Sequence, residues 1–430
     1  MRWVNCRGMT NKMAAPQIEE TRMHFRVLDS WRGIAALLVA IFHLNVYSAI
    51  YPLDFIRNAY LFVDFFFVLS GFVITHSYAG RLGTLEDLGS FAIRRLGRLW
   101  PLHAVVLLAF VTVESAKAVL AARAASFYIP PFTGANSLHT LPMNLAFAQS
   151  FGLEQQLTWN PPSWSICAEF WTYLIFAGAL FVGTTRLGRI RFAAAGLIAA
   201  ILIGSASTLI IFGQHGIDAT YDLGLVRCLY GFLVGHVTYR LWQALSRAKF
   251  NTGFLEAAAL IAVVVYVSVV GRTGYSFLAP LVFAVVVLVF AFESGPISRL
   301  MSNRGNEWLG RISYSIYMWQ AFIIFNFVDR PVSIIEKMTG GVLTTTEGVS
   351  SALGNEASKL IVVGGHFLPI LVTLLFVGLL VAVASVSYYL IEKPGQQLFA
   401  RLAGRRRRSG SLSQDGGRSR SPVQSAGVAR

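Results

Sequence analysis

Apolar residues along the chain are gathered into ten long blocks that are separated by polar segments. The blocks span residues 31–51, 60–79, 101–121, 165–184, 192–212, 223–243, 254–271, 275–293, 309–328 and 367–391. Apolar runs of about 18 to 22 residues are long enough to cross a hydrocarbon core of roughly 30 Å as helices. The pattern therefore predicts an all-α integral membrane protein with about ten transmembrane helices. The seventh and eighth blocks are separated only by Gly271-Arg272-Thr273-Gly274.

Basic residues lie mostly in alternate connecting segments. These segments carry Arg81, Arg94, Arg95, Arg98, Arg186, Arg189, Arg191, Arg240, Arg247, Lys249, Arg299, Arg304, Arg401 and Arg405 to Arg408. The other connections, 122–164, 213–222 and 329–366, hold few basic residues for their length. Loops rich in arginine and lysine stay in the cytoplasm. Both termini are therefore expected to be cytoplasmic, and the number of spans is expected to be even.

The overall composition agrees with a membrane protein. Hydrophobic residues make up 55% of the chain and charged residues 13%, against about 25% charged in an average soluble domain. The net charge of +15 is compatible with nucleic-acid binding, but the basic residues flank apolar blocks, so we expect a lipid bilayer as partner and no nucleic acid. The three cysteines are scattered, and no histidine or cysteine pair has metal-ligand spacing. We expect no metal and no bound cofactor.

The polar ends of the chain differ from the membrane domain, which we place at residues 25–397. Residues 1–24 lack the apolar core of a cleavable signal peptide and form a polar extension, in which Met13 and Met23 are alternative starts. Residues 398–430 are rich in Arg, Ser and Gly. This composition predicts a basic, disordered cytoplasmic tail that faces the anionic inner leaflet.

The first apolar block contains two ionisable residues, Arg32 and His43. An ionisable side chain within a membrane span costs about 2.5–3.5 kcal/mol on insertion scales, which makes it a functional candidate. A separation of eleven residues turns a helix to within about 20° of three full turns and advances it by about 16 Å. Both residues therefore share a face, with Arg32 at the cytoplasmic boundary as an anion clamp and His43 deeper as a proton acceptor. The alternative is that His43 is a neutral core histidine bonded to a neighbouring helix.

Two further groups of charged residues are candidates. Asp64 lies within the second block and needs a partner, either His43 or an arginine; the alternative is a purely structural ion pair. Arg94, Arg95 and Arg98 precede the third block, and Arg94 and Arg98 are spaced to face one way on a helix, where they would grip phosphates. The alternative is that these arginines only set the topology.

Glu169 lies near the non-cytoplasmic end of the fourth block. There its carboxylate would orient an acceptor hydroxyl or the imidazole of His43. Trp164 and Trp171 flank it, and such aromatic residues are also typical of a membrane interface.

Taken together, these residues resemble the membrane-bound acyltransferase-3 family over about residues 25–397. Six elements match in order: Arg32 and His43 as a basic residue and a histidine with ten residues between them; Phe66 to Phe72, including Ser70 and Gly71; Arg94, Arg95 and Arg98; Trp164, Ser165 and Glu169; Ser313 to Trp319; and Tyr389 to Pro394. One position departs from the pattern, because Gln320 stands where many members have histidine.

The resemblance implies a membrane O-acyltransferase of the stand-alone form without an SGNH domain, in a bacterial cytoplasmic (inner) membrane. It implies acyl-CoA, commonly acetyl-CoA, as co-substrate and a hydroxyl of a cell-surface polysaccharide or other glycan as acceptor, with a glycan-synthesis complex as a candidate partner. Arg32, Arg94, Arg95 and Arg98 would bind the donor. His43 would be the general base or carry the acyl group, with Glu169 and Asp64 as further catalytic candidates.

Two other functions fit a chain of many membrane helices. A transporter or flippase of glycans or lipid-linked sugars would move its substrate without forming an ester, but the two halves lack paired Gly- or Pro-broken helices at matching positions. A non-catalytic scaffold for glycan synthesis would have no use for Arg32, His43 and Asp64 within membrane spans.

Overall fold

The computed structural model describes residues 24–78, 80–123, 130–185, 193–247, 252–345, 360–362, 364 and 367–416. The first half of the chain forms α1 (Arg26–His43), α2 (Asp54–Arg57), η1 (Ala59–Leu61), α3 (Phe62–Tyr78), α4 (Leu85–Ala121), η2 (Gly134–Asn136), η3 (Leu138–Thr140), α5 (Leu141–Leu145), α6 (Ser163–Thr185), α7 (Ala193–Phe212) and β1 (Gln214–Ile217). The second half forms α8 (Gly224–Leu245), α9 (Gly253–Val270), η4 (Gly274–Leu278), α10 (Ala279–Phe290), α11 (Pro296–Met301), α12 (Arg304–Arg311), α13 (Ser313–Ile323), η5 (Ile324–Asp329), α14 (Arg330–Thr339), β2 (Thr344–Thr345), β3 (Leu360–Ile361), α15 (Phe367–Ser387), η6 (Tyr388–Glu392) and α16 (Lys393–Gly416).

Six of the helical segments among the described residues are long and apolar enough to cross a membrane. They are Ala59–Tyr78, Leu85–Ala121, Ser163–Val182, Ala195–Phe212, Gly253–Val270 and Phe367–Gly404. This confirms an all-α protein of the membrane-spanning kind. The other four predicted blocks coincide with α1, α8, α10 and α13, and their crossing stays a prediction.

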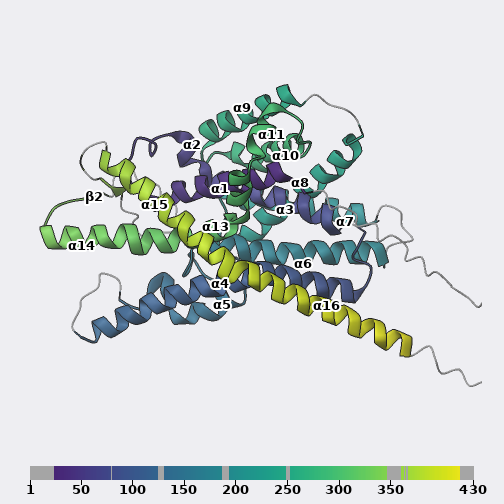
Figure 1. Ribbon diagram of the computed structural model, residues 1–430, viewed down its shortest axis with the longest axis horizontal. Helices are drawn as coiled ribbons and strands as arrows, with labels where there is room; N and C mark the ends of the chain where they lie inside the picture. Colours follow the sequence, from purple (N-terminus) through teal and green to yellow (C-terminus); the bar gives the residue numbers. More distant parts are fainter. Residues whose placement is uncertain are drawn as a thin grey trace, which may run out of the picture.

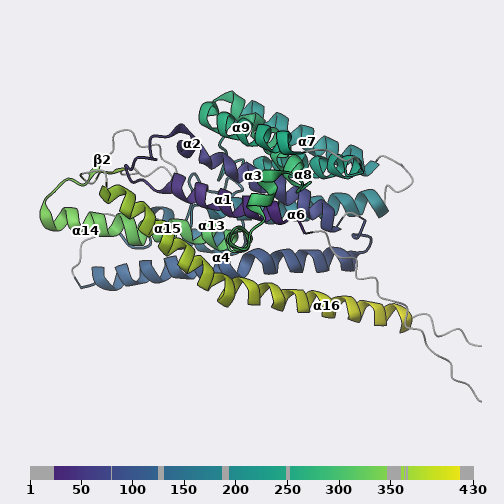
Figure 2. The same cartoon turned by 45° about the horizontal axis from the view of Figure 1, so that its top comes forward.

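The helices form an elongated bundle with β2 and α14 at one end and the end of α16 at the other (Figure 1). Strand β2 pairs antiparallel with β3, with Thr344 opposite Ile361 and Thr345 opposite Leu360. Helices α4 and α16 run side by side in both views (Figures 1 and 2). The long α15 and α16 run diagonally across the bundle in Figure 1.

Helix α1 ends earlier than the sequence predicts. We expected the first span to reach residue 51, but the helix stops at His43. The chain then pairs with β3, because the amide of Ile361 donates to Asn45 (2.9 Å) and the carbonyl of Ile361 accepts from Tyr47 (2.9 Å). This long-range pairing replaces the next helical turn, and it leaves His43 at the C-terminal end of α1.

The C-terminal region is also more ordered than predicted up to Gly416, where α16 ends. The expected disordered tail begins at 398, but Phe399 packs against Gly97 of α4 and Ala403 is fully buried. The hydroxyl of Ser90 donates to the carbonyl of Ala403 (3.4 Å). Packing on α4 therefore extends the helix, while residues 417–430 of the predicted tail lie outside the described residues.

Close packing of α3 on α8 depends on two glycines. A Cβ atom added at Gly71 would lie 1.9 Å from the carbonyl oxygen of Phe232, and one at Gly235 would lie 1.9 Å from that of Val68. Small residues allow membrane helices to approach in this way. The helix α3 carries Ser70 and Asp64, so this contact also positions the site.

Replacing Gly71 by alanine is expected to destabilise the protein by about 1–3 kcal/mol, the usual range for overpacking. The added methyl group must push α8 away from α3. The apparent melting temperature of the detergent-solubilised protein measures the effect. Gly178→Ala on α6 is the matched control, because a Cβ there meets no atom within 4 Å; equal melting temperatures for the two variants would contradict the prediction.

Candidate active site

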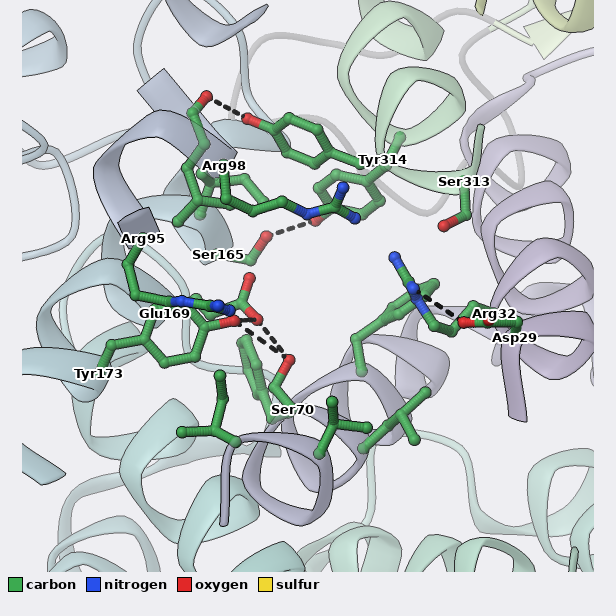
Figure 3. Close-up of a pocket in the computed structure, with 18 of the residues that line it drawn as sticks. Asp29, Arg32, Ser70, Arg95, Arg98, Ser165, Glu169, Tyr173, Ser313 and Tyr314 are labelled. Carbon is green, nitrogen blue, oxygen red and sulfur yellow. Dashed lines mark hydrogen bonds and ion pairs between the residues drawn. The ribbon is translucent and has the colours of Figure 1, made fainter. Parts of the chain in front are cut away.

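A cavity of about 390 Å³ lies among α1, α3, α4, α6 and α13. Its lining includes six of the predicted site residues: Arg32, Ser70, Arg95, Arg98, Ser165 and Glu169. The guanidinium groups of Arg32, Arg95 and Arg98 point into it from α1 and α4 (Figure 3). With Arg311, the lining has four arginines against the two carboxylates Asp29 and Glu169. We call it the arginine cavity; its surplus positive charge suits an anionic ligand.

The arginine cavity runs along much of helix α3. Its lining extends from Ile74, near the end of α3, to Val63, near the beginning of that helix. Eleven residues of α helix correspond to about 16 Å. The cavity therefore reaches from the side of Arg32 and Arg95 deep into the bundle.

The arginines of α4 face the cavity in a different pair from the predicted one. We expected Arg94 and Arg98 to share a face, but Arg95 and Arg98 line the cavity and Arg94 does not. The sequence prediction treated this segment as a loop beside a span, whereas it lies inside the continuous helix α4. Residues three apart on a helix also share a face, and packing on α3 and α6 selects Arg95.

Arg95 and Arg98 are each held by neighbouring side chains. Arg98 donates to the buried Glu392 (2.6 Å), which also accepts from Ser315 (2.8 Å) and Gln396 (3.1 Å). Arg95 donates to the hydroxyl of Tyr78 (3.3 Å). The Ser315–Glu392 hydrogen bond connects the last two matching elements, Ser313 to Trp319 and Tyr389 to Pro394.

Arg32 forms an ion pair with Asp29 one turn earlier on α1 (3.1 Å), and Asp29 also contacts His24 (2.9 Å). The Arg32 side chain remains 26% exposed. Because Asp29 neutralises part of its charge without burying it, Arg32 stays available to an anion at the mouth of the arginine cavity.

Glu169 lies inside the arginine cavity, on α6. Its carboxylate accepts hydrogen bonds from the hydroxyls of Ser70 and Tyr173. One helical turn before Glu169, the hydroxyl of Ser165 forms a hydrogen bond with the hydroxyl of Tyr317 (2.8 Å). Ser70 of α3 and Ser165 and Glu169 of α6, predicted from two separate motifs, thus line one cavity, and α3 and α6 both pack on α8.

His43 lines a second, smaller space of about 40 Å³, which we call the histidine cavity. Its Nδ1 lies 2.8 Å from the carbonyl oxygen of Val39. A carbonyl only accepts, so Nδ1 carries the proton in this contact and Nε2 keeps its lone pair. Nε2 is therefore the basic nitrogen of the His43 ring.

The two cavities share a wall. Val63 and Tyr317 line both of them, while Trp164 lines the histidine cavity and its neighbour Ser165 lines the arginine cavity. The predicted common face of Arg32 and His43 thus corresponds to two compartments, with the side chains of Val63 and Tyr317 between them.

Asp64 has an arginine as its partner and not His43. Arg227 on α8 donates to both carboxylate oxygens of Asp64 (3.0 and 2.8 Å), and the two side chains are 1% and 0% exposed. Asp64 is absent from the linings of both cavities. Its position agrees with the structural ion pair that the sequence left open, and a catalytic role for Asp64 stays a prediction without a contact to support it.

Several residues around the two cavities were missed by sequence reasoning. Arg227 lies inside a predicted span, so the rule that singled out Arg32 should have singled it out as well. Tyr317 belongs to a matching element but carries no charge to attract notice. Asp218 and Arg272, which line the histidine cavity, lie in short connections where charged residues are common.

Comparison with known proteins identifies residues 25–392 with the acyltransferase domain of the acyltransferase-3 family. The chain is 34% identical over 169 residues to protein 2 in the picA locus of Rhizobium radiobacter, covering 36% of this chain and 81% of that protein. It is 25% identical over 331 residues to the peptidoglycan O-acetyltransferase OatA of Listeria monocytogenes, covering 71% of this chain and 50% of that protein. The chain thus spans about half the length of that O-acetyltransferase. No solved structure matches. With a match that includes Arg32, His43, Glu169 and Glu392, the chain belongs to the acyltransferase-3 family of membrane proteins.

Proposed function

We propose that this protein transfers an acyl group from acyl-CoA to a hydroxyl of a cell-surface glycan, and that the acyl group is acetyl. The observation that carries the proposal is the arrangement of two cavities: one lined by arginines, the other by His43, with only Val63 and Tyr317 lining both. The names of relatives support acetyl transfer to a glycan, since one is a peptidoglycan O-acetyltransferase.

The donor would enter the arginine cavity. Its volume of about 390 Å³ lies within the range of small-molecule sites, and Arg32, Arg95 and Arg98 offer guanidinium groups to the phosphates of CoA. The thin, uncharged arm that carries the thioester would then extend along α3 towards Val63 and Tyr317. Phosphates at the mouth and a thioester at depth match the distribution of charge in the cavity.

The chemistry would take place at Nε2 of His43. In direct transfer, Nε2 accepts the proton of the acceptor hydroxyl while the hydroxyl oxygen forms a bond to the thioester carbonyl carbon. The C–S bond breaks, and CoA leaves as a thiol after taking up a proton. In a relay, Nε2 first forms the bond to the carbonyl carbon, and the C–S bond breaks to release CoA as a thiolate. The acceptor oxygen then displaces the imidazole, and the hydroxyl proton passes to the freed Nε2 and finally to the thiolate. The free lone pair of Nε2 serves both routes.

The topology proposed from the loop charges assigns the cavities to opposite sides of a bacterial inner membrane. Ten spans with both termini in the cytoplasm put the beginning of α1, with Arg32, on the cytoplasmic side and His43 near the other side. The donor would be taken from the cytoplasm, and the glycan would be modified outside it. Tyr317 then stands where the acyl group must pass.

Mass spectrometry of surface glycans tests the proposal. The parent strain, a strain with the gene deleted and the deletion strain carrying the gene on a plasmid are compared. We expect one acyl mass increment that disappears on deletion and returns with the plasmid. Identical glycan spectra in the three strains, with the protein detected in the membrane, would refute acyl transfer to a surface glycan.

Arg32→Ala is expected to raise the Michaelis constant for acetyl-CoA by about 10- to 100-fold, because a hydrogen bond to a charged group contributes about 1.5–3 kcal/mol. The turnover number should change less, since Arg32 does not touch the reacting atoms. Initial rates in inverted membrane vesicles over a range of acetyl-CoA concentrations measure both constants. Arg401→Ala, an exposed arginine of α16 outside both cavities, is the control; equal Michaelis constants for the two variants would argue against the clamp.

A further inference from the structure

The histidine cavity has a polar rim that the proposed reaction does not yet use. We propose that this cavity receives the acceptor hydroxyl and that Asp218 and Arg272 bind neighbouring hydroxyls of the same sugar. The inference rests on the proposed function and adds to it the place where the carbohydrate binds. It assigns specificity-determining residues on the side of the protein away from the arginine cavity.

The walls of the histidine cavity come from one end of the bundle. Asp218 and Thr220 lie in the connection between β1 and α8, and Arg272 lies between α9 and η4. Pro161 and Pro162 precede α6. Helix α1 reaches these connections with its last residue, His43. The arginine cavity is lined instead by the first half of α1 and of α4, so the two cavities approach Tyr317 from opposite directions.

The size of the histidine cavity limits what can enter it. A water molecule needs about 10–15 Å³ of such space, so about 40 Å³ accommodates a hydroxyl with the carbon that carries it, but not a sugar ring. A sugar would therefore insert one hydroxyl towards Nε2 of His43 and leave its ring at the rim. The ring would then lie against the side chains that border the opening.

The rim carries an exposed ion pair. Arg272 donates to Asp218 at 3.0 Å, and their side chains are 38% and 18% exposed. A carboxylate has about four acceptor sites and a guanidinium five N–H donors in a plane. Arg227 and Arg272 each donate one hydrogen bond to Asp218, so the pair keeps sites for adjacent hydroxyl groups of one sugar. The opening thus offers both acceptors and donors in the same lining as His43.

A chain of ion pairs fixes Asp218 in place. Arg227 donates to Asp218 (3.3 Å) and, with its other nitrogens, to the buried Asp64. The inner pair of this chain is inaccessible and the outer pair is exposed. A chain that served only to join α3 to α8 would need no accessible outer member, whereas a binding rim needs a carboxylate held in one orientation by a rigid support.

The test blocks the cavity chemically from the outside. Thr220→Cys places a thiol in the lining. The native Cys167 and Cys228 are buried, and Cys6, outside the described residues, is replaced by serine in every protein tested. Right-side-out membrane vesicles that contain endogenous glycan are treated with the membrane-impermeant anion sulfonatoethyl methanethiosulfonate. Glycan acylation with acetyl-CoA enclosed in the vesicles is then measured before treatment, after treatment and after reversal with dithiothreitol. Tyr275→Cys, 74% exposed on the neighbouring η4 and outside the cavity lining, is the matched control.

We expect treatment of Thr220→Cys to reduce glycan acylation at least tenfold, with recovery on reversal and unchanged binding of acetyl-CoA to the solubilised protein. Treated Tyr275→Cys should keep its activity. Undiminished acylation by fully labelled Thr220→Cys would overturn the acceptor site and leave the proposed function intact. Loss of acetyl-CoA binding on labelling would also overturn it, because the block would then act on the donor. If parent vesicles acylate no glycan at all, the proposed function itself fails.

A pair of substitutions examines the rim directly. Asp218→Asn should raise the glycan concentration needed for half-maximal acylation at least tenfold, with the Michaelis constant for acetyl-CoA unchanged. Asp222→Asn, an exposed carboxylate of the same connection that does not line the cavity, should leave both values as they are. An Asp218→Asn protein with normal glycan dependence would remove Asp218 from the site.

Discussion

Replacing His43 by alanine will reduce acyl transfer by about 10²–10⁴-fold, the usual contribution of general acid–base catalysis, or more if the residue carries the acyl group. The Nδ1–H of His43 is held by the carbonyl of Val39 at 2.8 Å, which leaves Nε2 as the only basic nitrogen of the ring. Alanine removes this nitrogen without removing a residue from a close helix contact. The rate of glycan acylation in membrane vesicles, normalised to the amount of protein in the membrane, measures the loss.

His103→Gln is the matched control for this prediction. His103 is also a buried histidine, and it contacts the carbonyl of Asn144 at 2.9 Å, but it lines neither cavity. Glutamine retains a donor for that carbonyl, so the control should keep most of its activity. A His43→Ala protein that is inserted and transfers acyl groups at the parent rate would end the assignment of His43 as the reacting base.

Labelled acetyl-CoA separates direct transfer from the relay. If His43 carries the acyl group, the parent protein incubated with labelled acetyl-CoA and no acceptor will hold label on the peptide that contains His43 after a rapid quench. In direct transfer no label is bound, and thioester cleavage needs the acceptor. In both routes the thioester must first pass the wall formed by Val63 and Tyr317.

Local rules predicted much of the site from the sequence. Helical spacing predicted a common face of α1 for Arg32 and His43, which line two adjoining cavities, and ionisable residues within spans pointed to Asp64. Both predictions rest on contacts between residues close together in the chain or on the cost of burying charge. They needed no knowledge of how the helices pack.

The errors have a different origin, because each depends on a contact between distant segments. Helix α1 stops at His43 because Asn45 and Tyr47 pair with Ile361. No local sequence pattern predicts a pairing partner so far along the chain. Arg95 faces the cavity in place of Arg94 because the packing of a continuous α4 decides the direction of its side chains. The partner of Asp64 is an arginine, one of the two predicted alternatives, but its identity as Arg227 depends on the packing of α3 on α8. Site geometry in a helix bundle is therefore set mainly by helix rotation, which a single sequence specifies only weakly.

Arg227→Ala is expected to destabilise the folded protein by about 3–5 kcal/mol, because removal of one member of a buried ion pair leaves the other charge unpaired. Arg227 is 1% exposed and its partner Asp64 is 0% exposed, so no solvent can replace the lost contact. The apparent melting temperature and the amount of protein recovered from the membrane measure the effect. Arg401→Ala, an exposed arginine, controls for the loss of a positive charge.

The double variant Asp64→Leu with Arg227→Met distinguishes a structural pair from a catalytic carboxylate. Apolar side chains of similar volume often replace a buried ion pair without loss of stability, so most of the melting temperature should return. Asp218 would then lose its inner support, since Arg227 donates to it at 3.3 Å, and the dependence on glycan should weaken while acetyl-CoA binding is unchanged. If the double variant is stable, binds acetyl-CoA and yet shows no transfer even at saturating glycan, Asp64 takes part in the reaction itself. If the single variant Arg227→Ala has the same apparent melting temperature as the parent protein, the buried pair does not hold α3 to α8.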